Sequence, residues 1–225
     1  MRVLFNEELE QVADDLETMV SDVQASITTA GTALLNSDIE AAQSVIDGDA
    51  KIDDLESSIV DQCVQLLAKQ NPVATDLRVI VSTIRLASTF ERMGDLARHI
   101  AESARRAYPQ PAVPQQARDL FVKMQKRVEE TAAQVVEMLS NRDTKTADEI
   151  IAGDDVLDDL HHATFSVATS DTWEGTSQDT INLVLLGRYY ERFGDHAVSA
   201  ARRVVYIVSG FDPTKEPEHT APDPD

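Results

Sequence analysis

The sequence is poor in cysteine, aromatic residues and positive charge, and each shortage excludes a class of protein. Cys63 is the only cysteine, so one chain can form neither an internal disulfide nor a thiolate metal cluster. Aromatic residues make up 5% of the chain although 42% of it is hydrophobic, which favours packed helices over a β-sandwich. Only 20 basic residues stand against 40 acidic ones, and the formal net charge of −20 disfavours nucleic acids and anionic lipids as partners.

Long apolar runs are also missing from the sequence. The first nine residues include Arg2, Glu7 and Glu8, and no later segment has the length and composition of a membrane span. We therefore expect a cytoplasmic protein that reaches a membrane only through protein partners. A chain of 225 residues can bury one large core or two smaller ones.

Proline positions divide the chain because proline disrupts a helix interior. Pro109, Pro111 and Pro114 form one cluster, and four more prolines follow residue 212. Between them, apolar periodicity predicts six helices at 6–35, 38–69, 72–107, 115–141, 143–170 and 177–210. The expected helix starts are an Asp38 cap, an Asp143 cap, and Asn71 followed by Pro72.

The two halves of the chain repeat. A shift of 105 residues aligns residues 34–55 with 139–160 and gives ten identities in 22 positions. A shift of 100 residues aligns the segment 90–97, which contains ERMGD, with 190–197, which contains ERFGD. The repeat predicts an all-α fold of two tandem three-helix bundles related by internal pseudo-symmetry. The expected parts are a bundle over 1–107, a proline-rich linker over 108–114, a bundle over 115–210 and a disordered acidic tail over 211–225.

Each unit carries four carboxylates on its second and third helices. They are Asp49, Asp53, Glu91 and Asp95 in the first unit, and Asp154, Asp158, Glu191 and Asp195 in the second. A spacing of four residues puts two side chains on the same helix face. Leu77 and Val81 precede the third-helix pair at heptad steps, so we expect the carboxylates to continue a stripe that faces the core.

Four neighbouring carboxylates need positive charge to compensate them. Arginines can provide it through salt bridges, and the candidates are Arg85, Arg92, Arg98, Arg188 and Arg192. A hard cation held by oxygen ligands is the alternative, with iron, manganese, magnesium, calcium or zinc admissible. His99, His161 and His162 lie near the acids, but the two copies do not share these positions. Gly94 and Gly194 recur inside helices, where they indicate either close helix packing or space for a ligand.

Two features are typical of a known protein family: the doubled ERxGD motif and the segment from Pro72 to Arg78, PVATDLR. Over about residues 1–210 the chain resembles the PhoU phosphate-regulatory proteins. The resemblance implies a homodimer, multinuclear clusters of iron, zinc, manganese or magnesium at the eight carboxylates named above, and no enzymatic activity. It also implies a negative regulator of phosphate uptake and starvation signalling, which couples the ATPase of the Pst phosphate ABC transporter to a sensor histidine kinase. The second unit has no counterpart of Pro72 or of residues 76–78.

Two other functions remain open from the sequence. A ferritin-like di-metal oxidase also holds carboxylates inside a helical bundle, but its usual pattern needs Glu-x-x-His from two helices. This chain has only the run from Asp158 to His161, without a counterpart in the first unit. The other alternative is a non-catalytic helical protein that stores metal or has a structural role.

Overall fold

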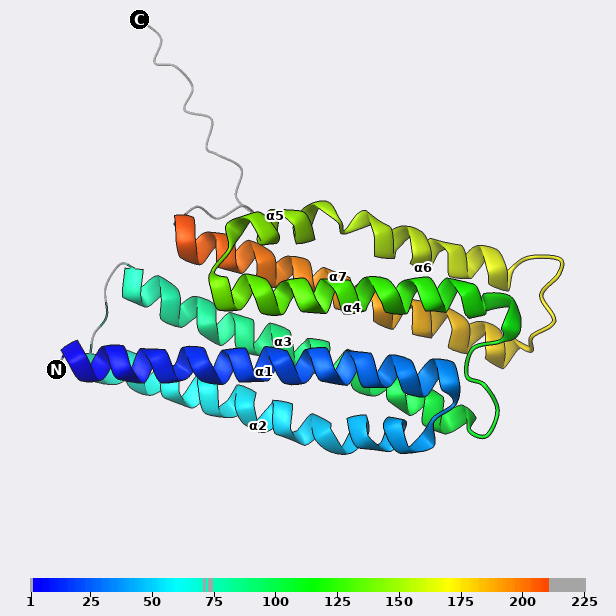
Figure 1. Cartoon of the computed structure of the whole chain (residues 1–225), viewed down its shortest axis with the longest axis horizontal. Coiled ribbons are helices and arrows are strands. Elements are labelled where there is room, and N and C mark those ends of the chain that lie inside the picture. The colour runs from blue at the N-terminus through cyan, green and yellow to red at the C-terminus, as the bar shows by residue number, and fades with distance from the viewer. Residues whose placement is uncertain (1, 71, 73–74, 211–225) are drawn as a thin grey trace, which may run out of the picture.

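The computed structural model describes residues 2–70, 72 and 75–210, and no strand occurs in these ranges. Seven α-helices and one short 3₁₀ helix make up this part of the chain (Figure 1). They are α1 (Arg2–Asn36), α2 (Ile39–Gln70), α3 (Thr75–Ala107), η1 (Gln115–Ala117), α4 (Arg118–Asn141), α5 (Thr144–Ala152), α6 (Asp155–Ala168) and α7 (Ser177–Ser209). None of these helices is both long enough and apolar enough to cross a membrane.

The helices form two three-helix bundles, which confirms the expected fold class. In the first, α1, α2 and α3 pack against one another. In the second, α4 and α7 pack together and against the pair α5 and α6. The bundles meet where α3 contacts α7 and α1 contacts α4, so α2 lies on one outer side of the molecule and α5 and α6 on the other (Figure 1).

The helix starts follow the capping residues of the sequence. The Asp38 carboxylate accepts hydrogen bonds from the backbone N–H groups of Glu40 and Ala41 at 3.0 Å. Asp143 caps α5 in the same way through the N–H of Lys145. Both expected caps are thus confirmed, since a side-chain acceptor satisfies N–H groups that have no partner in the first turn. The expected Asn71 cap lies outside the described residues, and α3 begins at Thr75.

The expected helix over 143–170 is wrong in one respect, because it is divided into α5 and α6 at Gly153 and Asp154. The Arg127 guanidinium of α4 donates a 2.9 Å hydrogen bond to the Gly153 carbonyl, an acceptor that a continuous helix would use for its own ladder. The equivalent Gly48 lies inside the continuous helix α2 and has no neighbour where a Cβ would point. The contact with a side chain of α4 thus distinguishes the interrupted helix of the second unit from the continuous helix α2 of the first.

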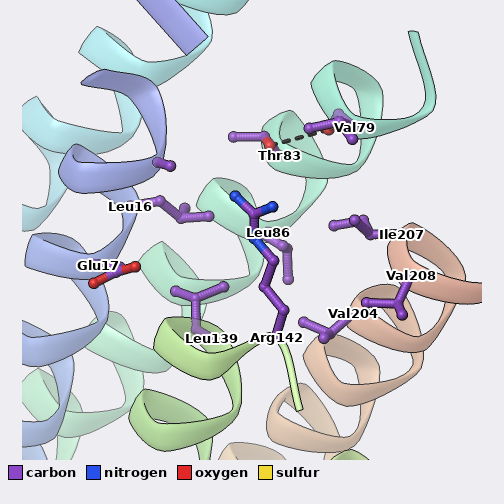
Figure 2. Close-up of a pocket in the computed structure, with 11 residues that line it drawn as sticks. Leu16, Glu17, Val79, Thr83, Leu86, Leu139, Arg142, Val204, Ile207 and Val208 are labelled. Atoms are coloured by element: carbon purple, nitrogen blue, oxygen red, sulfur yellow. Dashed lines mark hydrogen bonds between the residues drawn. The ribbon is translucent and has the colours of Figure 1, made fainter. Parts of the chain in front are cut away.

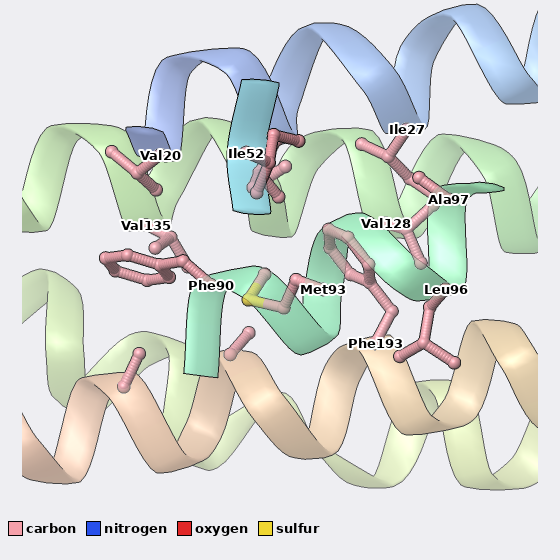
Figure 3. Packing of buried hydrophobic residues seen from close by; sticks show 14 of the residues in the cluster. Val20, Ile27, Ile52, Phe90, Met93, Leu96, Ala97, Val128, Val135 and Phe193 are labelled. Carbon is pink, nitrogen blue, oxygen red and sulfur yellow. The ribbon is translucent and has the colours of Figure 1, made fainter. Parts of the chain in front are cut away.

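The two bundles share one continuous hydrophobic core (Figure 3). Phe90 and Met93 of α3 and Phe193 of α7 are fully buried where the bundles meet. Cys63 is also fully buried, and burial raises the pKa of its thiol to about 11. The long apolar faces of α3 and α7 thus bury each other, which places the carboxylates of these two helices on the adjacent faces.

A buried polar contact also joins the bundles. Gln125 of α4 donates a hydrogen bond to the Ile27 carbonyl of α1 at 3.1 Å and accepts one from the Tyr190 hydroxyl of α7 at 2.8 Å. Gly31 makes this possible, because the Gln125 amide fills the space that a Cβ at position 31 would need. Polar groups that satisfy each other in a core favour one helix arrangement over its alternatives.

Candidate metal centres

The first carboxylate cluster, Asp49, Asp53, Glu91 and Asp95, lies where α2 packs against α3, and arginines bridge most of it. The Arg98 guanidinium contacts Asp49 and Asp95, each with an N···O distance of 2.6 Å. Arg92 contacts Asp95 at 2.9 Å and Glu91 at 3.3 Å. The positive charge that four acids require is therefore supplied largely by the protein itself.

The arginines act unequally on the pKa values of the first cluster. Burial opposes ionisation of Asp95, but the hydrogen bond and charge of Arg98 outweigh it, so the pKa of Asp95 lies below its usual value. Asp49 contacts the same guanidinium, yet burial and its two acidic neighbours keep its pKa raised. Burial, followed by the charge of Asp95, raises the pKa of Glu91 to about 7. Glu91 thus holds a proton at pH values at which an ordinary glutamate is ionised.

The second cluster, Asp154, Asp158, Glu191 and Asp195, lies between α7 and the segment from the α5–α6 break into α6. Asp158, Glu191 and Asp195 each offer a carboxylate oxygen, and these oxygens lie within 4.8 Å of one another. Ligand oxygens at 2.0–2.6 Å from one cation lie at most about 5 Å apart, so the three can share an ion. Among the described residues, only this group of three or more potential ligands is so close together.

Less positive charge reaches the second cluster. Arg188 forms an ion pair with Glu191, but the position equivalent to Arg98 is Val198. The second oxygen of Glu191, Oε2, is buried without a hydrogen-bond partner, and Glu191 as a whole is 9% exposed. Burial and the charges of Asp195 and Asp158 raise the pKa of Glu191. A buried carboxylate oxygen without a partner, on a residue of this close group of acids, fits a cation.

Asp154 completes the second cluster from the α5–α6 break. Burial raises its pKa first, and the charges of Asp158 and Asp195 add to the effect. Arg202 lowers it through charge, although the two groups form no ion pair within 4.0 Å. Asp154 is therefore close to the group of three without belonging to it.

The expectation of a core-facing carboxylate stripe is wrong for the start of its apolar part. Leu77 is 41% exposed and Val81 is 39% exposed, so the start of this stripe is at the surface, whereas Ile84, one heptad before Glu91, is partly buried and packs against the core. The apolar residues that α3 buries, such as Phe90 and Met93, lie on the adjacent face. The carboxylates are half-buried because a neighbouring helix and the arginines cover them, with side chains of Glu91 and Asp95 21% and 17% exposed.

The two recurring glycines serve close helix packing. A Cβ on Gly94 would lie 3.0 Å from Ile52 Cδ1, and a Cβ on Gly194 would lie 2.7 Å from Leu157 Cδ1. Ile52 and Leu157 are equivalent in the repeat, so the same contact occurs in both units. Each glycine lets the last helix of its unit, which carries two carboxylates, approach the segment that carries the other two.

The remaining candidates for charge compensation or ligation lie outside these contacts. Among the described residues, Arg85 and Arg192 form no ion pair within 4.0 Å. His99 packs on the Tyr189 ring with centroids 5.2 Å apart, and the His162 ring contacts the Asp158 carbonyl. His161 packs against Phe165 and is not part of the close group of ligands. Comparing positions 98 and 198 in the aligned repeat could have revealed the difference between the clusters; the role of Arg127 has no such signal.

The fold and these clusters define a class of helical protein in which a duplicated three-helix unit repeats one carboxylate arrangement. The sequence profile of the PhoU domain matches residues 16–104 and 121–204. A Mycobacterium tuberculosis protein named phosphate-specific transport system accessory protein PhoU homolog 1 is 37% identical over 216 residues, covering 96% of this chain and 98% of that protein. The chain belongs to the PhoU family.

More distant relatives agree with this assignment. A Rhizobium meliloti protein named phosphate-specific transport system accessory protein PhoU homolog is 28% identical and covers 94% of this chain, with 90% of its own length matched. The crystal structure of PhoU from Pseudomonas aeruginosa superposes with a TM-score of 0.85 at 27% identity, covering 92% of this chain and all of that chain. Likeness thus extends over both bundles.

Proposed function

We propose that this protein is a regulatory adaptor that restrains phosphate uptake through contact with the ATPase of a phosphate ABC transporter and passes the transporter state to a sensor histidine kinase. The observation that carries the proposal is similarity over nearly the whole chain to proteins named as accessory to the phosphate-specific transport system. The adaptor acts in the cytoplasm as a homodimer and without catalysis, so its surfaces carry the function.

The proposal includes metal binding at the carboxylate clusters. The buried, unpartnered Oε2 of Glu191 and the close group with Asp158 and Asp195 support a cation at the second cluster. Asp49, Asp53, Glu91 and Asp95 are the corresponding ligands in the first. Oxygen ligands suit magnesium, manganese, iron or zinc, and a bound ion would hold α6 to α7 by neutralising their mutual repulsion.

Two experiments test the adaptor function. Deletion of the gene should raise phosphate uptake and starvation-reporter expression at high phosphate, and the intact gene should restore both. Pull-down of the full chain from native lysate at high phosphate should recover the transporter ATPase or the sensor kinase. Unchanged uptake and reporter expression in the deletion strain would contradict the proposal, whatever the metal content of the protein.

A further inference from the structure

An apolar cavity lies at one end of the contact between the bundles, and we name it the junction cavity. Its volume is about 90 Å³, and four helices line it: α1, α3, α4 and α7 (Figure 2). Lining residues include Leu16, Thr83, Leu86, Leu139, Val204 and Val208. Val208 is 48% exposed, so the cavity opens to the surface beside the end of α7. The space suits an apolar side chain that arrives from outside.

Three arginines without an ion-pair partner among the described residues lie at or beside the junction cavity: Arg142 lines it, and Arg78 and Arg203 directly precede the lining residues Val79 and Val204. Figure 2 shows the Arg142 side chain reaching from the end of α4 into the middle of the lining residues. Arg78 of α3 and Arg203 of α7 both lie over the Tyr206 ring, at 5.8 and 5.6 Å from its centroid. None of the three arginines forms an ion pair with a residue that the structure describes, although the chain has a net charge of −20. Glu17 is the one acid among the described residues that line the cavity, so three arginines against one acid leave a local excess of positive charge, which attracts an acidic segment.

The opposite end of the α3–α7 pair shows how a chain segment covers the equivalent site. Because α3 and α7 are equivalent in the repeat and run antiparallel, the two ends of the pair correspond (Figure 1). At the far end, the segment that follows α3 runs over the helices. It buries Val113, which is 2% exposed, and places Ala112 at a cavity of about 80 Å³ beside Leu186. The segment that follows α7 begins at the corresponding place beside the junction cavity.

The C-terminal segment 211–225, which lies outside the described residues, has the composition that the junction cavity requires. It carries five acids, one lysine and a single aromatic residue, Phe211. Its attachment point is Gly210, whose left-handed backbone (φ 76°) redirects the chain at the end of α7 and packs against the Arg78 guanidinium. Fifteen residues span up to about 50 Å when extended, far more than the step from Gly210 back to Val208.

We propose that segment 211–225 docks in the junction cavity of its own chain, with Phe211 in the apolar space and its acids against Arg78, Arg142 and Arg203. Docking covers a positively charged surface at the junction of the bundles. A partner that uses this surface must then displace the segment. The segment would be an internal competitor present at high effective concentration.

A spin label on the segment tests this directly in the full-length protein. Thr214→Cys can be labelled selectively, because Cys63 is buried and its thiol has a raised pKa. We expect the methyl NMR signals of Leu16, Leu86 and Val204 to broaden, and the broadening to be lost at about 1 M salt, where charges are screened within about 3 Å. The matched control is a label at exposed Asp171, in the loop before α7, which should leave these signals sharp.

Two variants separate docking from a general change in the fold. Arg142→Glu combined with Arg203→Glu should abolish the broadening, and so should a chain whose five C-terminal acids are replaced by their amides, which leaves the described residues untouched. Sharp methyl signals in the labelled chain at low salt would overturn the proposal. Broadening seen only when labelled and unlabelled copies are mixed would also overturn it, because the segment would then dock on a second copy.

Discussion

The two units of this protein differ in how their four neighbouring carboxylates are balanced by arginine side chains. In the first, Arg98 reaches across α2 and α3 and joins Asp49 to Asp95, with 2.6 Å to each. In the second, the equivalent position is Val198, and Asp158, Glu191 and Asp195 are left as a close group with one buried oxygen unpartnered. The difference teaches that duplicated motifs need not keep equal chemistry, since one substitution outside the motif decides whether an arginine bridges the acids.

The largest expected effect is the loss of metal from the second cluster. Glu191→Gln combined with Asp195→Asn removes two of the three proposed ligands, and we expect the affinity for manganese or iron to fall by at least about 100-fold. Isothermal titration of the chelator-treated protein measures this. The matched control is Glu91→Gln combined with Asp95→Asn, which should cost less. Equal losses in the two variants would show that the clusters do not differ.

Removing Arg98 should destabilise the first unit. Arg98→Val leaves Asp49 and Asp95 half-buried without their shared cation, and we expect the free energy of unfolding to fall by about 2 kcal/mol without metal. Urea unfolding of the chelator-treated protein measures the loss, and added metal should recover part of it. Arg85→Val is the control, since Arg85 is exposed and forms no ion pair. A loss no greater than in the control would contradict this role of Arg98.

The reciprocal change should lower the metal affinity of the second cluster. Val198→Arg brings into α7 the residue that bridges the first cluster, and we expect metal affinity to fall by about tenfold, equivalent to about 1.4 kcal/mol. Because Val198 is 4% exposed, circular dichroism and urea unfolding must show that the variant stays folded. Val198→Leu is the control for a larger side chain without the charge of arginine. Unchanged metal affinity in a folded Val198→Arg variant would show that position 198 does not control metal binding at the second cluster.

Metal-free protein should lose stability as the pH rises through the range set by Glu91. The pKa of Glu91 is raised from 4.5 to about 7 by burial and by Asp95, so the native state binds more protons than the unfolded state between these values. The free energy of unfolding therefore decreases from about pH 4.5 to about pH 7. Glu91→Gln should flatten this decrease. Urea unfolding at several pH values provides the slopes, and a slope in the variant identical to that of the unsubstituted protein would contradict the assignment.

The smallest effects are expected at the paired glycines. Gly94→Ala gains helix propensity of about 1 kcal/mol and meets the flexible end of Ile52 at 3.0 Å, so we expect little net change. Gly194→Ala meets Leu157 at 2.7 Å and should destabilise the protein by about 1 kcal/mol. Thermal unfolding of the two variants gives the comparison. A Gly94→Ala variant that is the less stable of the two would show that the packing at the glycines has been misjudged.

The sequence predicted the fold well because its signals are local. Proline positions, helix periodicity and the Asp38 and Asp143 caps each depend on neighbours within one turn. The internal repeat then indicated which helices pack into the same bundle. The break at Gly153 was missed, since it accompanies a hydrogen bond from Arg127, 26 residues away. The same Gly-Asp pair in α2 stays helical, so the dipeptide alone could not have revealed it.

The carboxylate clusters were predicted in composition but not in charge balance. Heptad spacing brought together the acids of each unit, yet it assigned the exposed Leu77 and Val81 to the core. An α-helix drifts by about 20° per heptad against a strict seven-residue repeat, so residues two heptads apart no longer share one face. Whether an arginine reaches an acid depends on side-chain conformation and on the neighbouring helix. Arg92, Arg98 and Arg188 make such contacts, whereas Arg85 and Arg192 make none with described residues.

The shortness of α5 has a consequence for how fast ions could exchange. Isolated helices below about 12–15 residues are marginal in water, and α5 has nine, so it keeps its shape by packing on α4 and α7. Such a segment opens locally at a lower free energy than the long helices around it. Opening of α5 would move Asp154 away while Glu191 and Asp195 stay on α7. Ions would thus exchange at the second cluster through local opening of α5, on a timescale separate from unfolding of the whole bundle.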